Sequence, residues 1–255
     1  MRNMKVIKFG GHAMGEKNAP WMNLIADLWK SGERFVVVHG GGPQINEELK
    51  FRNIKSEFID GLRITTPEVM SVVETILTGT VLREVVRLLQ GAGLPAVGIC
   101  GSDGQTLKVQ IRAAGKYGLV GEVKSVDPRL LKSLIDSNFL PVVAPVSTDE
   151  NGQALNVNAD LASGAIAGAL AAEEIIFMTD VAGIYRNWPD ESSLITEISI
   201  SDLKLLEFSE GMIPKVEAVI SALSSGAKSA RVIDGRSQLA FADALVGKGG
   251  TCVRI

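Results

Sequence analysis

Residues 35–42 have the sequence FVVVHGGG, in which a short run of β-formers leads directly into three glycines. The apolar run is too short for a helix, so it predicts a strand. Glycine lets a backbone approach a ligand closely, and Pro43 behind the glycines favours the first turn of a helix. The stretch therefore predicts a strand, a glycine turn and a helix in succession, as in α/β proteins.

The same order of elements recurs on both sides of this stretch. Before it, residues 5–9 form a strand pattern that ends in Gly10 and Gly11, and a helix is expected over residues 20–30. After it, strands are expected at residues 96–100, 140–145, 175–179, 231–234 and 251–255. Continuous apolar strands that alternate with helices indicate a mostly parallel open sheet covered on both faces.

Other segments complete this outline. A long helix is expected from Thr66-Pro67 to about Gln90, and a hairpin is expected from residues 107–113 and 119–126. Further helices are expected over residues 127–137, 161–170, 201–208, 216–225 and 239–246. We expect two lobes of one open sheet, residues 1–150 and 151–255, with a soft boundary near Asn151.

Composition narrows the class of partner. The chain has 255 residues, of which 46% are hydrophobic and 22% charged, with a net charge of −3. A weak net charge gives no general attraction for polyanions, so nucleic acid is not an expected partner. No apolar stretch is long enough to cross a bilayer, and no signal peptide is expected. Cys100 and Cys252 lack metal-ligand spacing and are expected to be buried thiols of a cytoplasmic protein.

The first two glycine turns are candidate anion sites. Each follows a strand and exposes N–H groups at a helix start, where ligands of open α/β sheets bind. Lys8 lies inside the end of the first strand, between two apolar residues. Burying a lysine there is costly unless it meets an anion; otherwise the side chain must extend to water. We favour a functional Lys8.

Three later segments add polar groups. Asn156 and Asn158 alternate with apolar residues before a helix and are suited to reading a polar substrate, while Asp160 is either functional or a helix N-cap. Residues 179–185, TDVAGIY, are a strand end that enters a glycine turn, and Lys215 stands at a helix start. A phosphate-binding loop of the G-x-x-x-x-G-K-[ST] type and the protein-kinase motifs are absent from the sequence.

Together these segments resemble the amino acid kinase family over essentially the whole chain. The matching pieces, in order, are KFGGHAM, VVVHGGGPQI, GLRITTPEVM, LPVVAPV, NVNAD, TDVAGIY, GMIPKVEA and VIDGR. The resemblance implies a three-layer αβα sandwich, with an N-terminal lobe (1–150) for an acyl amino acid and for dimerisation, and a C-terminal lobe (151–255) for ATP. It also implies ATP-dependent phosphorylation of the γ-carboxylate of N-acetyl-L-glutamate, a step of arginine biosynthesis.

The resemblance further implies a role for each site residue. Lys8 and Lys215 stabilise the transferring phosphoryl group, Asp160 orients both lysines, and the N–H of Gly11 approaches that group. The substrate is held by Gly41 and Gly42, by Arg63 at its α-carboxylate and by Asn156 at its acetylamido group, with Asn158 beside them. The nucleotide is expected to contact Gly10, Asp180, Val181, Ala182, Gly183, Ile184 and Tyr185, with Glu207, Phe208 and Ser209 beside the adenine.

These predicted site residues suit the phosphorylation of a carboxylate. A substrate carboxylate with a pKa of about 4.3 is already ionised at pH 7, so the obstacle is to bring two anions together. Cations and backbone N–H groups aimed at the γ-phosphoryl group address that obstacle. Mg²⁺ is expected to arrive with ATP, held mainly by the nucleotide, so we name no protein residue as a metal ligand.

Two departures and two alternatives accompany the resemblance. His12 replaces a small residue and either narrows the first glycine turn, contacts a phosphate or is solvated. Only seven residues precede Lys8, so we expect the protein to lack the N-terminal helix of arginine-inhibited hexameric relatives and to be an arginine-insensitive homodimer. The alternatives are a kinase for a carrier-linked or N-blocked 2-aminoadipate and a non-catalytic amino-acid sensor on the same fold.

Overall fold

The computed structural model describes residues 4–10, 20–209 and 211–255, and the chain within it forms two compact units. Unit 1 comprises Met1–Phe35 and Ser163–Ile255, and unit 2 comprises Val36–Ala162. Gly11 and His12, which the sequence singles out, lie outside the described residues.

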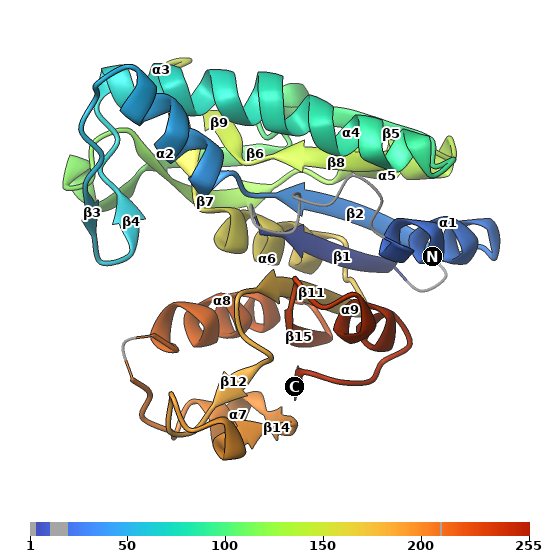
Figure 1. The fold of residues 1–255 in the computed structure, drawn as a ribbon. Helices are drawn as coiled ribbons and strands as arrows, with labels where there is room; N and C mark the ends of the chain where they lie inside the picture. Colours follow the sequence, from blue (N-terminus) through green and yellow to red (C-terminus); the bar gives the residue numbers. More distant parts are fainter. Residues whose placement is uncertain (1–3, 11–19, 210) are drawn as a thin grey trace. The chain divides into compact units, whose positions relative to one another are not determined.

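Unit 1 contains the sheet strands β14 (Glu197–Ser199), β16 (Thr251–Arg254), β15 (Ser229–Asp234), β11 (Glu174–Thr179) and β1 (Met4–Phe9), in that order (Figure 1). β11 is parallel to both β1 and β15, whereas β16 is antiparallel to β15. Its helices are α1 (Pro20–Lys30), most of α6 (Ala159–Ala169), α7 (Ile200–Leu203), α8 (Ile213–Ser224) and α9 (Gln238–Leu245), and α8 and α9 both contact β15. A small hairpin, β12 (Ile184–Tyr185) and β13 (Leu194–Ile195), follows the end of β11.

Unit 2 contains the parallel strands β2 (Arg34–His39), β8 (Leu140–Ala144) and β5 (Ala96–Cys100). α2 (Gly42–Phe51) follows β2, and the long helix consists of α3 (Pro67–Glu74), the π-helical segment η2 (Thr75–Val81) and α4 (Leu82–Gly91). α4 and α5 (Arg129–Asp136) pack against β8. A second sheet has the order β6 (Leu107–Ile111), β7 (Val120–Val126), β10 (Ala154–Val157) and β9 (Val146–Thr148). The short hairpin of β3 (Phe58–Ile59) and β4 (Leu62–Arg63) completes the unit.

The predicted α/β class is confirmed: the central sheet is mostly parallel and helices flank it, as in the three-layer αβα fold. Its inner strands contain apolar runs, and all five residues of β8 are buried. The predicted hairpin of residues 107–126 is confirmed by the antiparallel pairing of β6 with β7. Thr66 caps the long helix, as expected, since its Oγ1 accepts a hydrogen bond from the N–H of Val69 at 3.3 Å.

Three sequence expectations differ from the structure. The long helix contains seven π-helical residues, which apolar periodicity does not reveal. The helix expected over residues 201–208 is limited to α7, and Phe208 lies after it. Both cysteines are free thiols; Cys252 is buried, but Cys100 is only half-buried.

The compact units also group the chain differently from the predicted lobes 1–150 and 151–255. The N-terminal strand β1 belongs with the C-terminal segment because it pairs in parallel with β11, with Lys8 opposite Phe177. A strand that pairs far along the chain cannot be assigned to a lobe by its position in the sequence. Residues 151–162 belong to unit 2, since β10 pairs with β7 and β9.

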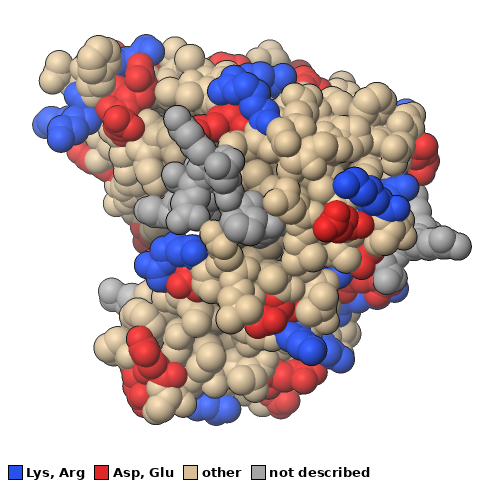
Figure 2. All heavy atoms as spheres, turned by 45° about the vertical axis from the view of Figure 1, so that its right-hand side comes forward, with Lys and Arg blue, Asp and Glu red and all other residues tan. Residues whose placement is uncertain are grey.

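Charged side chains of both signs are mixed on the surface. On the face drawn in Figure 2, Lys and Arg alternate with Asp and Glu. Nothing in the described part of the chain forms a helix with the length and apolar character needed to span a bilayer.

Candidate active site

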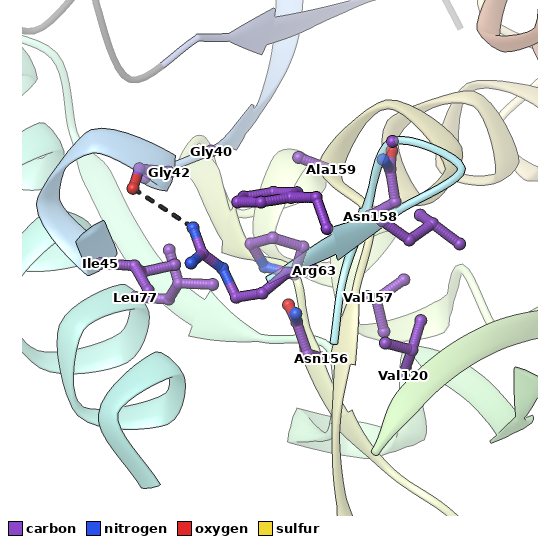
Figure 3. Close-up of a pocket in the computed structure, with 15 residues that line it drawn as sticks. Gly40, Gly42, Ile45, Arg63, Leu77, Val120, Asn156, Val157, Asn158 and Ala159 are labelled. Carbon is purple, nitrogen blue, oxygen red and sulfur yellow. Dashed lines mark hydrogen bonds between the residues drawn. The ribbon is translucent and has the colours of Figure 1, made fainter. Parts of the chain in front are cut away.

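A pocket of about 190 Å³ lies in unit 2 where the second glycine turn meets the hairpin β3–β4 and strand β10 (Figure 3). Every residue that lines it belongs to unit 2: Gly40, Gly41, Gly42, Ile45, Phe58, Gly61, Leu62, Arg63, Leu77, Val120, Pro145, Asn156, Val157, Asn158 and Ala159. Backbone N–H groups, a guanidinium and two amides share the pocket with an apolar wall. Such a mixture suits a small ligand with both anionic and apolar parts.

Arg63 supplies a buried cation to this pocket. Only 7% of the residue is exposed, and burial lowers the pKa of its guanidinium, although arginine stays charged in proteins. The guanidinium donates hydrogen bonds to Ser56 Oγ and to the carbonyl oxygen of Gly42, the latter at 3.5 Å, and lies 4.7 Å from the centre of the Phe58 ring. Arg63 forms no ion pair with any described residue. A buried cation that contacts only neutral groups favours an anionic ligand.

Asn156 is fixed beside Arg63 by a buried hydroxyl. Its Nδ2 donates to Thr65 Oγ1 at 3.1 Å, and the Thr65 hydroxyl donates to the carbonyl oxygen of Arg63 at 2.9 Å. Thr65 is fully buried, so this chain of bonds holds β10 and β4 in a fixed relation. Figure 3 shows the Asn156 amide pointing into the pocket near Arg63. Arg63 and Asn156, two of the five residues that the resemblance assigns to the substrate, thus lie close together.

Asn158 corrects one part of the sequence interpretation. The helix cap considered for Asp160 is made instead by Asn158, whose Oδ1 accepts hydrogen bonds from the N–H groups of Asp160 and Leu161 at 2.9 and 3.1 Å. Asp160 is therefore in the first turn of α6 (Ala159–Ala169), where an acidic residue is favourable. Asn158 also lines the pocket, so its side chain both caps a helix and bounds the ligand site.

Gly41 packs closely against the long helix. A Cβ at this position would lie 2.6 Å from Leu77 Cδ2 and 3.3 Å from Val81 Cγ2, both on η2. The π-helical segment therefore supports the glycine turn, and Leu77 forms part of the pocket wall. Leu77 and Phe58 also line the pocket, although neither was expected there from the sequence. Only Phe58 could have been suspected from the sequence, because it is an aromatic residue five positions before Arg63.

His39 ends β2 immediately before the glycine turn and is fully buried. Its Nδ1 is 2.9 Å from the carbonyl oxygen of Gly40, and its Nε2 has no hydrogen-bond partner among the described residues. Burial disfavours the charged imidazolium and lowers the pKa of His39 to about 4. The side chain is therefore neutral at physiological pH.

This low pKa predicts a loss of stability in acid. The usual histidine pKa of 6.5 exceeds the folded value of about 4, so the unfolded chain binds more protons between these values. The contribution of His39 is fully present above pH 6.5 and declines as the pH falls toward 4, by about 3 kcal/mol in total at 1.4 kcal/mol per pKa unit. Urea unfolding at pH 7.5 and pH 4.5 measures it, with His39→Leu as control. Equal acid sensitivity of the two proteins would contradict the prediction.

In unit 1, two lysines approach the carboxyl ends of neighbouring strands. Lys8 is half-buried in β1, and β1 and β11 are parallel, so both strands end at the same sheet edge. Asp180 follows β11 directly, and its Oδ1 lies 3.2 Å from the Nζ of Lys215 in the first turn of α8. Partial burial raises the pKa of Asp180, but the charge and the hydrogen bond of Lys215, a backbone hydrogen bond and the charge of Arg236 together outweigh burial and lower this pKa.

The turn after β11 is held by a second set of bonds. Arg236 donates to the carbonyl oxygen of Asp180 at 2.8 Å and to both carboxylate oxygens of Asp234, at the end of β15. Next to this turn, five side chains form an apolar cluster: Val181, Tyr185, Met212, Leu194 and Phe208. Of the residues predicted beside adenine, Phe208 belongs to this cluster, while Glu207 and Ser209 are exposed. The nucleotide roles of these residues stay predictions.

No group of three or more His, Cys, Asp or Glu side chains suited to a metal ion occurs among the described residues. Cations, amides and backbone N–H groups lie near these strand ends, together with the carboxylates of Asp180 and Asp234 in unit 1, each of which pairs with a cation. The unit 1 turn and the unit 2 pocket thus suit anionic ligands, and neither contains a built metal centre in the described ranges.

Parallel strands that end in glycine turns, with lysines and an arginine near those ends, are typical of α/β proteins that bind anionic small molecules. The chain belongs to the amino acid kinase family, because residues 3–234 match the sequence pattern of that family.

Relatives and solved structures agree with this assignment. Acetylglutamate kinase of Thermosynechococcus vestitus is 44% identical over 238 residues, which cover 91% of this chain and 80% of that protein. The chloroplastic acetylglutamate kinase of Arabidopsis thaliana is 44% identical over 241 residues, which cover 91% of this chain and 69% of that protein. The crystal structure of smu.665 from Streptococcus mutans UA159 matches with a TM-score of 0.84 and 25% identity, over 100% of this chain and 99% of that one.

Proposed function

We propose that this protein transfers the γ-phosphoryl group of ATP to the γ-carboxylate of N-acetyl-L-glutamate, yielding N-acetyl-L-glutamyl 5-phosphate and ADP. The observation that carries the proposal is the buried cation Arg63 beside the amide of Asn156, in a pocket that a glycine turn closes. The 44% identity with acetylglutamate kinases over 91% of the chain supports the same reaction.

The unit 2 pocket has a group for each part of this substrate. Arg63 pairs with the α-carboxylate, and its planar guanidinium can donate two parallel hydrogen bonds. Asn156 receives the acetylamido group, and the apolar wall of Ile45, Leu77 and Val120 accommodates the methyl and methylene groups. The N–H groups of Gly41 and Gly42 receive the reacting carboxylate.

Unit 1 is proposed to bind ATP at the turn from Asp180 to Tyr185, with Gly10 near the phosphates and Phe208 beside the adenine. Mg²⁺ enters with the nucleotide and is held mainly by its phosphate oxygens. A carboxylate oxygen attacks the γ-phosphorus, a new P–O bond forms, and the bond from that phosphorus to the β,γ-bridging oxygen breaks. Lys8 and Lys215 stabilise the negative charge that the transferring group carries, and Asp160 orients the lysines.

A substrate panel tests this proposal. We expect ATP consumption, and a hydroxamate on trapping with hydroxylamine, with N-acetyl-L-glutamate but not with free L-glutamate. N-acetyl-L-2-aminoadipate, which is one methylene longer, is expected to give a kcat/KM lower by about 10–200-fold, the usual range for one methylene. A preference for the aminoadipate compound would instead favour the carrier-linked pathway, and binding without turnover of any panel member would favour a sensor.

Quaternary structure and location are also proposed from the resemblance. We infer a cytoplasmic homodimer, formed through the N-terminal lobe. Light scattering of the purified protein at micromolar concentration measures its mass directly, and a monomer or hexamer would contradict the homodimer.

A further inference from the structure

The imidazole of His39 has only one possible arrangement of its proton. A backbone carbonyl oxygen can only accept a hydrogen bond, so the 2.9 Å contact with Gly40 requires the N–H to be on Nδ1. The neutral ring carries a single N–H, and Nε2 is therefore an acceptor. Nε2 is buried and has no partner among the described residues.

An unpaired buried acceptor destabilises the fold relative to an apolar side chain of similar size. Core filling alone does not explain the histidine, because leucine or phenylalanine would fill the same space without leaving a polar atom unsatisfied. The Nδ1–H bond is the feature that an apolar side chain cannot supply.

That bond has a direct consequence for the glycine turn. The peptide group that joins Gly40 to Gly41 is planar, so its carbonyl and its N–H point in opposite directions. A donor that holds the Gly40 oxygen also fixes the direction of the Gly41 N–H. Gly40 and Gly41 both line the unit 2 pocket, and Gly41 packs against Leu77 on its other side.

We propose that His39 is a positioning residue, whose Nδ1–H holds the Gly40–Gly41 peptide so that the Gly41 N–H is aimed at the carboxylate of the bound acyl amino acid. This inference rests on the proposed function for the identity of that ligand. His39 does not line the pocket itself and acts only through the peptide group.

Side-chain replacements separate this role from a structural one. Asn places an N–H close to the position of Nδ1, whereas Leu fills the space without a donor. We expect His39→Leu to fold with unchanged or higher thermal stability and to raise the KM for N-acetyl-L-glutamate about tenfold to a hundredfold. The KM for ATP is expected to stay within about twofold of the wild-type value. We expect His39→Asn to recover most of the loss. Wild-type kinetics for His39→Leu, or equal damage in both variants, would overturn the inference.

A spectroscopic measurement on the wild-type protein does not depend on variants that fold. Two-bond ¹H–¹⁵N correlation spectra of the imidazole at pH 7 distinguish the two tautomers, and we expect the Nδ1–H form at His39. The Nε2–H form would overturn the inference whatever the activity. If another acid of the panel proves to be the substrate, the tautomer result still stands and the kinetic comparison is repeated with that acid, so the two proposals fail independently.

Discussion

Replacing Lys215 with alanine is expected to lower kcat by about 10²–10³-fold, the range found when one charge-stabilising donor is removed from an active site. Lys215 stands in the first turn of α8, where the helix dipole disfavours a cation. Its partner Asp180 is 64% exposed, so the ion pair adds little stability. Lys215 therefore contributes little to the stability of the fold. This favours a role in binding the transferring phosphoryl group. Steady-state assays with ATP and N-acetyl-L-glutamate measure the effect, and the melting temperature checks the fold.

Lys228→Ala is the matched control for this variant. Lys228 also lies in unit 1 and pairs with a carboxylate, that of Glu173 at 2.6 Å, but it is distant in sequence from every predicted nucleotide contact. We expect this variant to keep the wild-type kcat. An unchanged kcat in Lys215→Ala would remove Lys215 from the mechanism.

The double variant Lys8→Ala with Lys215→Ala examines whether both lysines act on one phosphoryl group. Residues that act as a unit have strongly non-additive effects on kcat, so the double variant is expected to lose much less than the product of the single losses. A fully multiplicative loss would mean that the two lysines act independently.

Much of the fold follows from local patterns in the sequence. The strand FVVVH, the glycine turn and the helix after Pro43 occur as expected, because buried parallel strands need continuous apolar runs and tight turns need glycine. The π-helical segment could not be predicted, since the apolar positions Ile76, Leu77 and Val81 also fit an ordinary helix. In the folded chain, Leu77 and Val81 of this segment lie close to Gly41.

The candidate site, like the fold, could be predicted only in part from the sequence. The amides of Asn156 and Asn158 stood out by residue type, because they suit a polar substrate, whereas Arg63 came only from the resemblance to the amino acid kinase family. The link between Arg63 and Asn156, the buried Thr65 hydroxyl, has no sequence signal, since threonine is common in strands and loops. The cap at Asn158 was missed because both Asn and Asp favour N-cap positions, and only geometry decides between Asn158 and Asp160.

Replacing Arg63 with alanine is expected to have the second large effect on activity. A substrate analogue shows whether this effect depends on the α-carboxylate. 4-Acetamidobutyrate retains the reacting carboxylate and the acetylamido group of N-acetyl-L-glutamate but lacks the α-carboxylate. We expect Arg63→Ala to raise the KM for N-acetyl-L-glutamate about 100-fold, because a desolvated guanidinium–carboxylate pair is lost. The same variant is expected to change kcat/KM for 4-acetamidobutyrate by less than about fivefold, since that ligand has no group for Arg63 to bind.

Two lysine variants provide controls for Arg63→Ala: Arg129→Lys at an exposed position and Arg63→Lys at the site itself. Arg129 is also in unit 2 but is 86% exposed and pairs with Asp127, so its change to lysine is expected to leave both substrates unaffected. Arg63→Lys keeps the charge but loses the planar fork and the stacking on Phe58, and lysine and arginine are not equivalent at such sites. We expect it to recover at most about a tenth of the lost kcat/KM. Equal losses with both substrates in Arg63→Ala would mean that Arg63 holds the pocket together instead of reading the α-carboxylate, because a damaged pocket cannot distinguish a ligand that has this group from one that lacks it.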